Sequence, residues 1–87
     1  MNSAAEEARA AAEAAARDSY GRLIAFLAAR ARDIAAAEDA LGKAFAAALH
    51  HWSRDGPPAN PDAWLLTAAR RKLIDAGRRI GVRRAAE

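Results

Sequence analysis

Apolar residues recur along this chain at the three- and four-residue spacing of amphipathic helices, and no segment alternates with the two-residue period of a strand. One such stripe consists of Tyr20, Leu23, Ile24, Leu27 and Ala31. β-Branched residues, which favour strands, are scarce. The pattern predicts an all-α fold, built as a compact bundle of three main helices.

The first predicted helix covers residues 4–31, with Ser3 as its N-cap and Glu6 three residues later, as in a capping box. Its first half is almost entirely Ala, Glu and Arg, which favour helix but offer little apolar surface to bury. We therefore expect residues 1–16 to form an alanine-rich helical extension in solvent, and residues 17–80 to form the packed domain.

A second helix is predicted to begin near Ile34. Its buried face is taken to comprise Ile34, Leu41, Phe45, Ala48, Leu49 and Trp52. We expect Phe45 and Leu27 to be buried, with Trp52 packed between the helices. The opposite face carries Asp39, Lys43, Ala46 and His50, with Gly42 at its margin. Residues 53–60 should form an ordered loop, because the Gly-Pro-Pro run within them cannot continue a helix.

The third predicted helix begins at Asn60, a favourable N-cap, with Pro61 in its first turn and Asp62 near the positive end of its dipole. It is expected to run to about Ile80 and to stop at Gly81. Residues 81–87 would then be a basic tail or linker. The core face comprises Leu65, Leu66, Ala69, Leu73, Ala76 and Ile80. The other face carries Trp64, Thr67, Ala68, Arg71, Lys72, Asp75, Arg78 and Arg79.

The absence of cysteine and of long apolar runs narrows the class of protein. Without cysteine the chain has neither disulfides nor a thiolate metal site. No apolar run approaches the ~20 residues of a membrane span. The N-terminus carries acids and lacks the apolar segment of a secretory signal. We expect one small, soluble domain in the cytoplasm.

Charge is unevenly distributed along the chain. Residues 1–52 have a net charge of −1, whereas residues 53–87 have a net charge of +4. Between residues 67 and 84 there are seven basic residues and one acid, Asp75. A basic helix beside a nearly neutral body favours a polyanionic partner, although the same pattern also fits a basic face that is merely solvated.

Catalytic chemistry finds no support in the sequence. His50 and His51 are adjacent, so on a helix they point in directions about 100° apart and cannot share a metal ion, which needs several convergent ligands. The three serines lack a nucleophile motif, and no phosphate-binding glycine loop is present. We expect a protein that is not an enzyme and has no catalytic residues, metal or cofactor.

A tryptophan beside a Gly-Pro loop, followed by a basic helix, suits nucleic acid, because rings stack on unpaired bases and cations neutralise phosphates. Four segments then carry a resemblance: "SYGRLIAFLA", "AEDALGKAFAAALHH", "WSRDGPPANPDAWLL" and "AARRKLIDAGRR". Over residues 17–79 the chain resembles the second conserved region of bacterial sigma factors of the extracytoplasmic-function (ECF) class, which direct RNA polymerase to promoters. The first and third segments also resemble a subgroup with a helical-repeat extension.

The resemblance implies two partners and the residues that contact them. The second helix would bind the clamp helices of the polymerase β′ subunit through Asp39, Gly42, Lys43, Ala46 and His50. The loop would capture a base flipped from the non-template strand of the promoter −10 element, and the third helix would read and help to melt that element. The DNA-binding residues would be Asn60, Trp64, Thr67, Arg71, Lys72, Asp75, Arg78 and Arg79. An anti-sigma factor is a further candidate partner.

The chain departs from the family pattern at three positions and in its extent. Gly42 stands where Gln is common and Lys43 where an acid is common, so the polar grip on the clamp is expected to be weaker. Arg71 stands where Asn is common, and suits phosphate or guanine contact. The fourth conserved region, which reads the −35 element, is absent. We therefore expect either part of a longer factor or a one-region relative.

Two other classes of protein stay open on the sequence alone. One is a helical protein–protein interaction module or homodimer, whose basic face is only solvated. The other is a basic amphipathic helix that lies on an anionic membrane. Against a membrane partner, the apolar face of residues 65–80 has the apolar faces of the first two helices to pack on.

Overall fold

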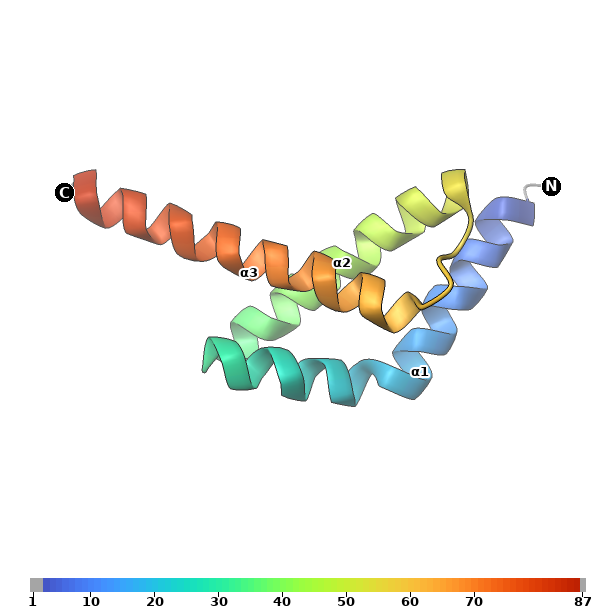
Figure 1. Cartoon of the computed structure of the whole chain (residues 1–87), viewed down its shortest axis with the longest axis horizontal. Helices are drawn as coiled ribbons and strands as arrows, with labels where there is room; N and C mark the ends of the chain where they lie inside the picture. Colours follow the sequence, from blue (N-terminus) through green and yellow to red (C-terminus); the bar gives the residue numbers. More distant parts are fainter. Residues whose placement is uncertain (1–2, 87) are drawn as a thin grey trace.

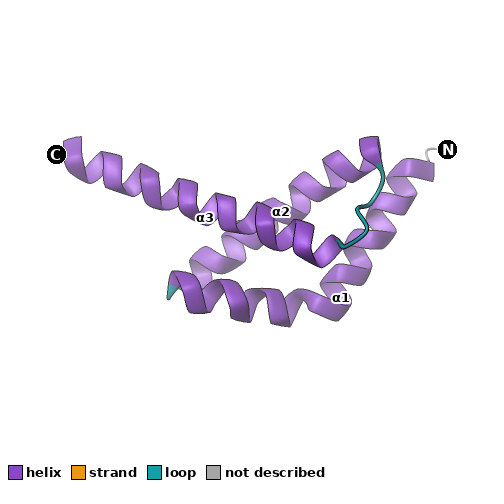
Figure 2. Ribbon diagram, in the orientation of Figure 1, coloured by secondary structure: helices purple, strands orange, loops and turns teal. Residues whose placement is uncertain are grey.

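The computed structural model describes the backbone of residues 3–86 and the side chains of residues 3–78. It consists of α1 (Ser3–Ala31), α2 (Ile34–Asp55) and α3 (Pro61–Ala86), and the described residues include no strand (Figure 2). The long helix α1 bends about halfway along, α3 crosses α2, and the C-terminal part of α3 projects beyond the other two helices (Figure 1). The prediction of an all-α fold with three main helices is confirmed.

Local signals in the sequence set the helix ends. The Asp33 carboxylate accepts a hydrogen bond from the Ala36 N–H at 3.0 Å and caps α2. At the other end of α2, Gly56 adopts a positive φ of 84° and donates its N–H to the Trp52 carbonyl at 2.8 Å. Glycine suits this conformation because it has no Cβ to clash. The chain therefore turns sharply into the short loop that leads to α3.

The core lies where the three helices meet. It consists mainly of leucine and alanine side chains around a buried Trp52, and its larger members are Leu23, Leu27, Leu41, Trp52 and Leu65. The predictions for Leu27 and Trp52 are thereby confirmed. Phe45 is only partly buried, so the prediction that it belongs to the fully buried core is wrong. Its ring stacks instead on Tyr20, with 6.5 Å between the ring centroids.

The buried face of α2 is narrower than its apolar stripe suggested. Small side chains fill most of it, namely Ala37, Ala40, Ala44 and Ala48 around Leu41. Ile34 and Leu49 were predicted to be buried, but they are 63% and 44% exposed. Because alanine side chains are short, the neighbouring helices approach α2 closely along the centre of this face, and large apolar residues at its edge and first turn stay outside the core.

The alanine-rich first half of α1 is packed, contrary to the expectation of a solvated extension. Ala8, Ala12 and Ala15 are buried, and with Ser19 they continue the line of the buried Leu23 and Leu27 at helical spacing. Alanine adds little buried area per residue, but it allows close contact between helices. Residues 3–16 therefore contribute to the core.

The third helix differs from its prediction at its C-terminal half. Leu65 and Ala69 are buried and Leu66 and Leu73 partly buried, as expected. Ala76 is exposed, because it faces two open hollows beside α1 and α2 rather than close-packed side chains. The Ile80 side chain lies outside the described residues. The helix continues past Gly81 to the end of the described chain, so residues 81–86 are helical. An isolated glycine costs a helix only ~1 kcal/mol relative to alanine, and no proline follows it.

Candidate nucleic-acid interface

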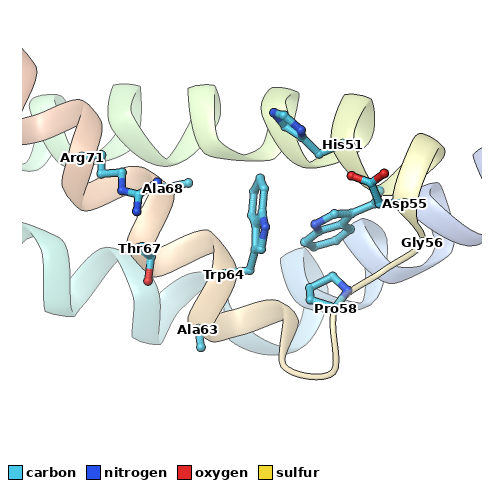
Figure 3. Close-up of a pocket in the computed structure, with 10 residues that line it drawn as sticks. His51, Asp55, Gly56, Pro58, Ala63, Trp64, Thr67, Ala68 and Arg71 are labelled. Carbon is cyan, nitrogen blue, oxygen red and sulfur yellow. The ribbon is translucent and has the colours of Figure 1, made fainter.

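A pocket of about 670 Å³ opens between the C-terminal end of α2, the connecting loop and the start of α3. Its lining combines aromatic rings, one acid and one arginine, and consists of His51, Trp52, Asp55, Gly56, Pro58, Ala63, Trp64, Thr67, Ala68 and Arg71. Trp64 stands in the middle of the pocket, with Asp55 and Pro58 on one side and Thr67 and Arg71 on the other (Figure 3). The pocket has ample room for a planar aromatic ligand such as a nucleobase, and its lining offers rings and polar groups to contact one.

Packing on one side fixes the Trp64 ring. It makes an edge contact with Trp52, with 5.3 Å between ring centroids and an interplanar angle of 71°, and lies 5.9 Å from the His51 ring. Trp52 is only 1% exposed, and its Nε1 donor has no hydrogen-bond partner among the described residues. The Trp64 ring therefore rests on a rigid support, and as a partly buried residue it still contributes to the wall of the pocket.

The loop that closes the pocket is held at both ends. Gly56 provides the turn out of α2, and Asn60 starts α3. The Asn60 side chain accepts a hydrogen bond from the Ala63 N–H at 3.1 Å, and its carbonyl accepts one from the Trp64 N–H at 3.2 Å. The predicted N-cap is confirmed. The Asn60 oxygen is therefore already used within the protein, which leaves the amide N–H₂ to contact a ligand.

The structure divides the predicted DNA-binding residues of α3 between two places. Trp64, Thr67 and Arg71 line the pocket. Lys72 and Asp75 line a different hollow of about 260 Å³, together with Asp39 and Lys43 of α2. Arg78 is exposed on α3, and the Arg79 side chain lies outside the described residues. The sequence placed these residues on one face of α3, but did not indicate that Lys72 and Asp75 lie beside the middle of α2 while Trp64, Thr67 and Arg71 lie beside its C-terminal end.

Three residues of the pocket wall were not assigned to the DNA site from the sequence, namely His51, Trp52 and Ala63. Asp55 was assigned to it as part of the predicted loop 53–60, but α2 continues to Asp55, so residues 53–55 are helical rather than loop. Trp52 was assigned to the core, which is correct, but its contact with Trp64 was not predicted. His51 and Asp55 are four residues apart, so they lie on one side of the last turns of α2. This spacing could have indicated a shared surface, whereas the position of that surface opposite α3 required the fold.

The predicted polymerase-binding residues are all exposed on α2: Asp39, Gly42, Lys43, Ala46 and His50. Lys43 Nζ lies 3.0 Å from Asp39 Oδ2, and these side chains are 57% and 68% exposed. Such surface pairs contribute little stability, about 0.3–0.5 kcal/mol on a helix. The face is therefore accessible, and its acid is partly neutralised by the neighbouring lysine.

Comparison with known proteins identifies the family. Residues 16–83 match the sigma-70 region 2 family. The chain belongs to this family. It is also 44% identical over 48 residues to an uncharacterized protein of Rhizobium meliloti (strain 1021); the aligned part is 55% of this chain and 11% of that protein. The chain therefore spans a small fraction of the length of that relative.

No solved structure matches the chain. Among the residues that the structure describes, no helix is long and apolar enough to span a bilayer. The family match covers the pocket, the exposed face of α2 and almost all of α3. It begins at residue 16, so the buried alanines of the first half of α1 precede it.

Proposed function

We propose that this domain acts in transcription initiation as the core-binding and promoter-reading part of a sigma factor of the ECF class. The observation that supports the proposal most directly is the position of the pocket. It lies at the loop–α3 junction, within the residues matched to sigma-70 region 2, and it combines a fixed tryptophan with a cation. The chemistry of transcription would belong to RNA polymerase, with which the domain would act in the cytoplasm.

The pocket and α3 suit the non-template strand of a melted −10 element. An unstacked base entering the pocket would meet the ring of Trp64, and stacking on an aromatic side chain contributes about 1–3 kcal/mol per base. Arg71, at the far side of this ring, has donors for a guanine edge or a phosphate. Farther along α3, Arg78 is exposed and would contact the phosphates of the strand. Duplex DNA presents no unstacked base, so melted DNA is the favoured ligand.

The exposed face of α2 is proposed to bind the β′ clamp helices. Asp39 would form the central polar contact, and the small Gly42 and Ala46 beside it would let a partner helix approach closely. This face points away from the core of the domain, and the five residues assigned to it are all accessible. The pocket at Trp64 is separate from this face, whereas the hollow that Asp39 and Lys43 share with Lys72 and Asp75 would lie at the boundary between the polymerase and DNA surfaces.

A direct test measures binding of the complex of this chain with polymerase core, or with a clamp-helix fragment, to a fluorescent oligonucleotide of the non-template −10 strand. The same sequence as duplex serves as the control and should bind more weakly. The substitution Arg71→Ala should change the preference among sequences. Arg70→Ala is the matched control, because Arg70 is also exposed but lines a separate hollow with Arg30 and Ile74.

Removal of a phosphate contact gives a different signature from removal of a base contact. Arg78→Ala should weaken binding to all single strands alike and reduce the slope of log affinity against log salt by about 0.7. Equal affinity for duplex and single strand, together with no effect of Arg71→Ala on sequence preference, would contradict the promoter-reading role. Failure of polymerase core to retain the domain would instead favour an unrelated helical interaction module.

A further inference from the structure

A hydrogen-bonded cluster of three side chains joins the middle of α1 to the first turn of α3. The Ser19 hydroxyl donates to Asp62 Oδ2 at 2.7 Å, across 43 residues of sequence. Arg22 Nη2 donates to the same Asp62 oxygen at 3.0 Å and to Ser19 Oγ at 3.2 Å. Each member therefore contacts both others, and the cluster links two helices that are far apart in the chain.

The cluster is more buried than an ordinary surface ion pair, so its hydrogen bonds should hold the two helices together more firmly. Ser19 is only 5% exposed and lies on the same buried line of α1 as Ala15 and Leu23. The Asp62 side chain is 35% exposed, whereas that of Arg22 is 74% exposed. A hydrogen bond from a buried hydroxyl to a carboxylate is strong and fixed in geometry, and the exposed guanidinium adds a weaker, screened attraction.

The cluster lies directly behind the wall of the pocket. Asp62 immediately precedes Ala63 and Trp64, which line the pocket on the front of the loop–α3 junction. On the back of the same junction, residues 59–62 face the first half of α1 across a shallow hollow that Ala11 and Ala15 help to line. The start of α3 is thus held by α1 on one side, while Ala63 and Trp64 face the pocket on the other.

We propose that Ser19, Arg22 and Asp62 are positioning residues that fix the first turn of α3 and so set the place of the Trp64 ring in the pocket. They touch no ligand and act through the backbone of residues 62–64. The proposal rests on the proposed function for its consequence in DNA binding, but the positioning itself is a property of the free protein. In this proposal α1 contributes to the site although none of its residues lines the pocket.

The positioning is tested first without DNA. Trp52 is buried, so acrylamide quenching of tryptophan fluorescence reports mainly on Trp64. The double variant Ser19→Ala/Asp62→Ala removes donor and acceptor together. At temperatures well below its melting point, acrylamide should quench its tryptophan fluorescence more strongly than that of the wild type. Arg17→Ala is the matched control, because Arg17 makes an exposed ion pair with Asp18 on the same helix. The control should quench like the wild type.

The consequence for DNA is tested with the polymerase-bound domain and two non-template oligonucleotides, one intact and one abasic at the position whose base contributes most. We expect the double variant to reduce the affinity ratio between them about fivefold, within the range of the net contribution of a typical intramolecular hydrogen bond. Asp62→Asn keeps an oxygen acceptor for Ser19, so its intact-to-abasic affinity ratio should lie between those of the wild type and the double variant. Affinity for the clamp fragment should stay unchanged, which separates positioning from general unfolding.

The outcomes distinguish the two proposals. If the double variant melts cooperatively and quenches like the wild type, the positioning role is overturned, whatever the DNA result. If quenching rises but the intact-to-abasic ratio is unchanged, the positioning of Trp64 is supported and its proposed consequence for base capture is overturned. If quenching rises and the wild type binds no single strand even with polymerase, the positioning stands and the promoter-reading function fails.

Discussion

Gly42 offers the sharpest test of the polymerase contact, because the structure separates its effect on stability from its effect on binding. It is exposed in the interior of α2, and beyond its two chain neighbours and the backbone of its own helix a Cβ added there would meet no atom within 4 Å. Glycine is less favourable than a straight-chain residue in a helix interior by roughly 0.5–1 kcal/mol. Gly42→Gln should therefore stabilise the domain and raise its melting temperature by about 2–8 °C.

The neighbouring substitution Lys43→Glu acts in the opposite direction on stability. Lys43 pairs with Asp39 at 3.0 Å, one helical turn away. A glutamate there replaces a weak attraction by a repulsion of similar size, each about 0.2–0.5 kcal/mol at an exposed i,i+4 pair. The combined variant Gly42→Gln/Lys43→Glu should thus be nearly as stable as the wild type, while it carries the polar pattern that resembles the family's clamp contact.

The assay is biolayer interferometry against an immobilised clamp-helix fragment, with thermal melting measured on the same samples. The combined variant should bind about tenfold more tightly, equivalent to ~1.4 kcal/mol, and Asp39→Arg should abolish binding. Gly21→Gln is the matched control: a Cβ at Gly21 also meets nothing within 4 Å, but Gly21 lies on α1, outside the proposed contact. If Gly42→Gln and Gly21→Gln both raise the melting temperature and neither variant nor the combination changes binding, the proposed contact surface is wrong.

Three further predictions concern the core and are checked by thermal or urea unfolding. Leu41→Ala should cost about 2–5 kcal/mol because Leu41 is fully buried, whereas Leu49→Ala on the exposed edge of α2 should cost less than ~1 kcal/mol; similar values would contradict the observed face of α2. Phe45→Ala should lower the free energy of unfolding by less than the ~3–5 kcal/mol expected for a fully buried phenylalanine, because Phe45 is only partly buried. Complete unfolding of this variant at room temperature would show that Phe45 belongs to the core. Ala8→Arg should lower the melting temperature strongly, because it forces a charge into a buried site, while Ala10→Arg on the exposed side of α1 should have little effect. Equal melting temperatures for the two variants would show that the first half of α1 is exposed to solvent rather than packed.

The features predicted correctly from the sequence are those that depend on neighbouring residues. Asn60 followed by Pro61 specifies the start of α3, and its hydrogen bond to the Ala63 N–H follows directly from that local pattern. Large leucines at helical spacing identify the centre of the core, as at Leu27 and Leu65. These residues would behave in the same way in many helical folds, so their environment need not be known.

Most of the wrong or missing predictions concern alanine residues and polar contacts between residues far apart in the sequence. An alanine favours a helix whether it is exposed or buried, so Ala8 and Ala10 look alike in the sequence and differ only when α1 is placed against its neighbours. In the same way, Asp62 at the start of a helix is sufficiently explained by the helix dipole. Its bond to Ser19 depends on two helices meeting, and no local pattern indicates it.

The structure also resolves why a tryptophan stands on the basic side of α3. A residue that served only the core would be expected among Leu65 and Ala69, and a residue that served only as a binding platform would be expected to be exposed. Trp64 is neither, because Trp52 supports one edge of its ring while the rest lines the pocket. A ring held in place before the ligand arrives loses little conformational entropy on binding, which favours affinity. The same arrangement would make the proposed base capture sensitive to anything that moves the first turn of α3, and the contacts from α1 are placed where they would control that movement.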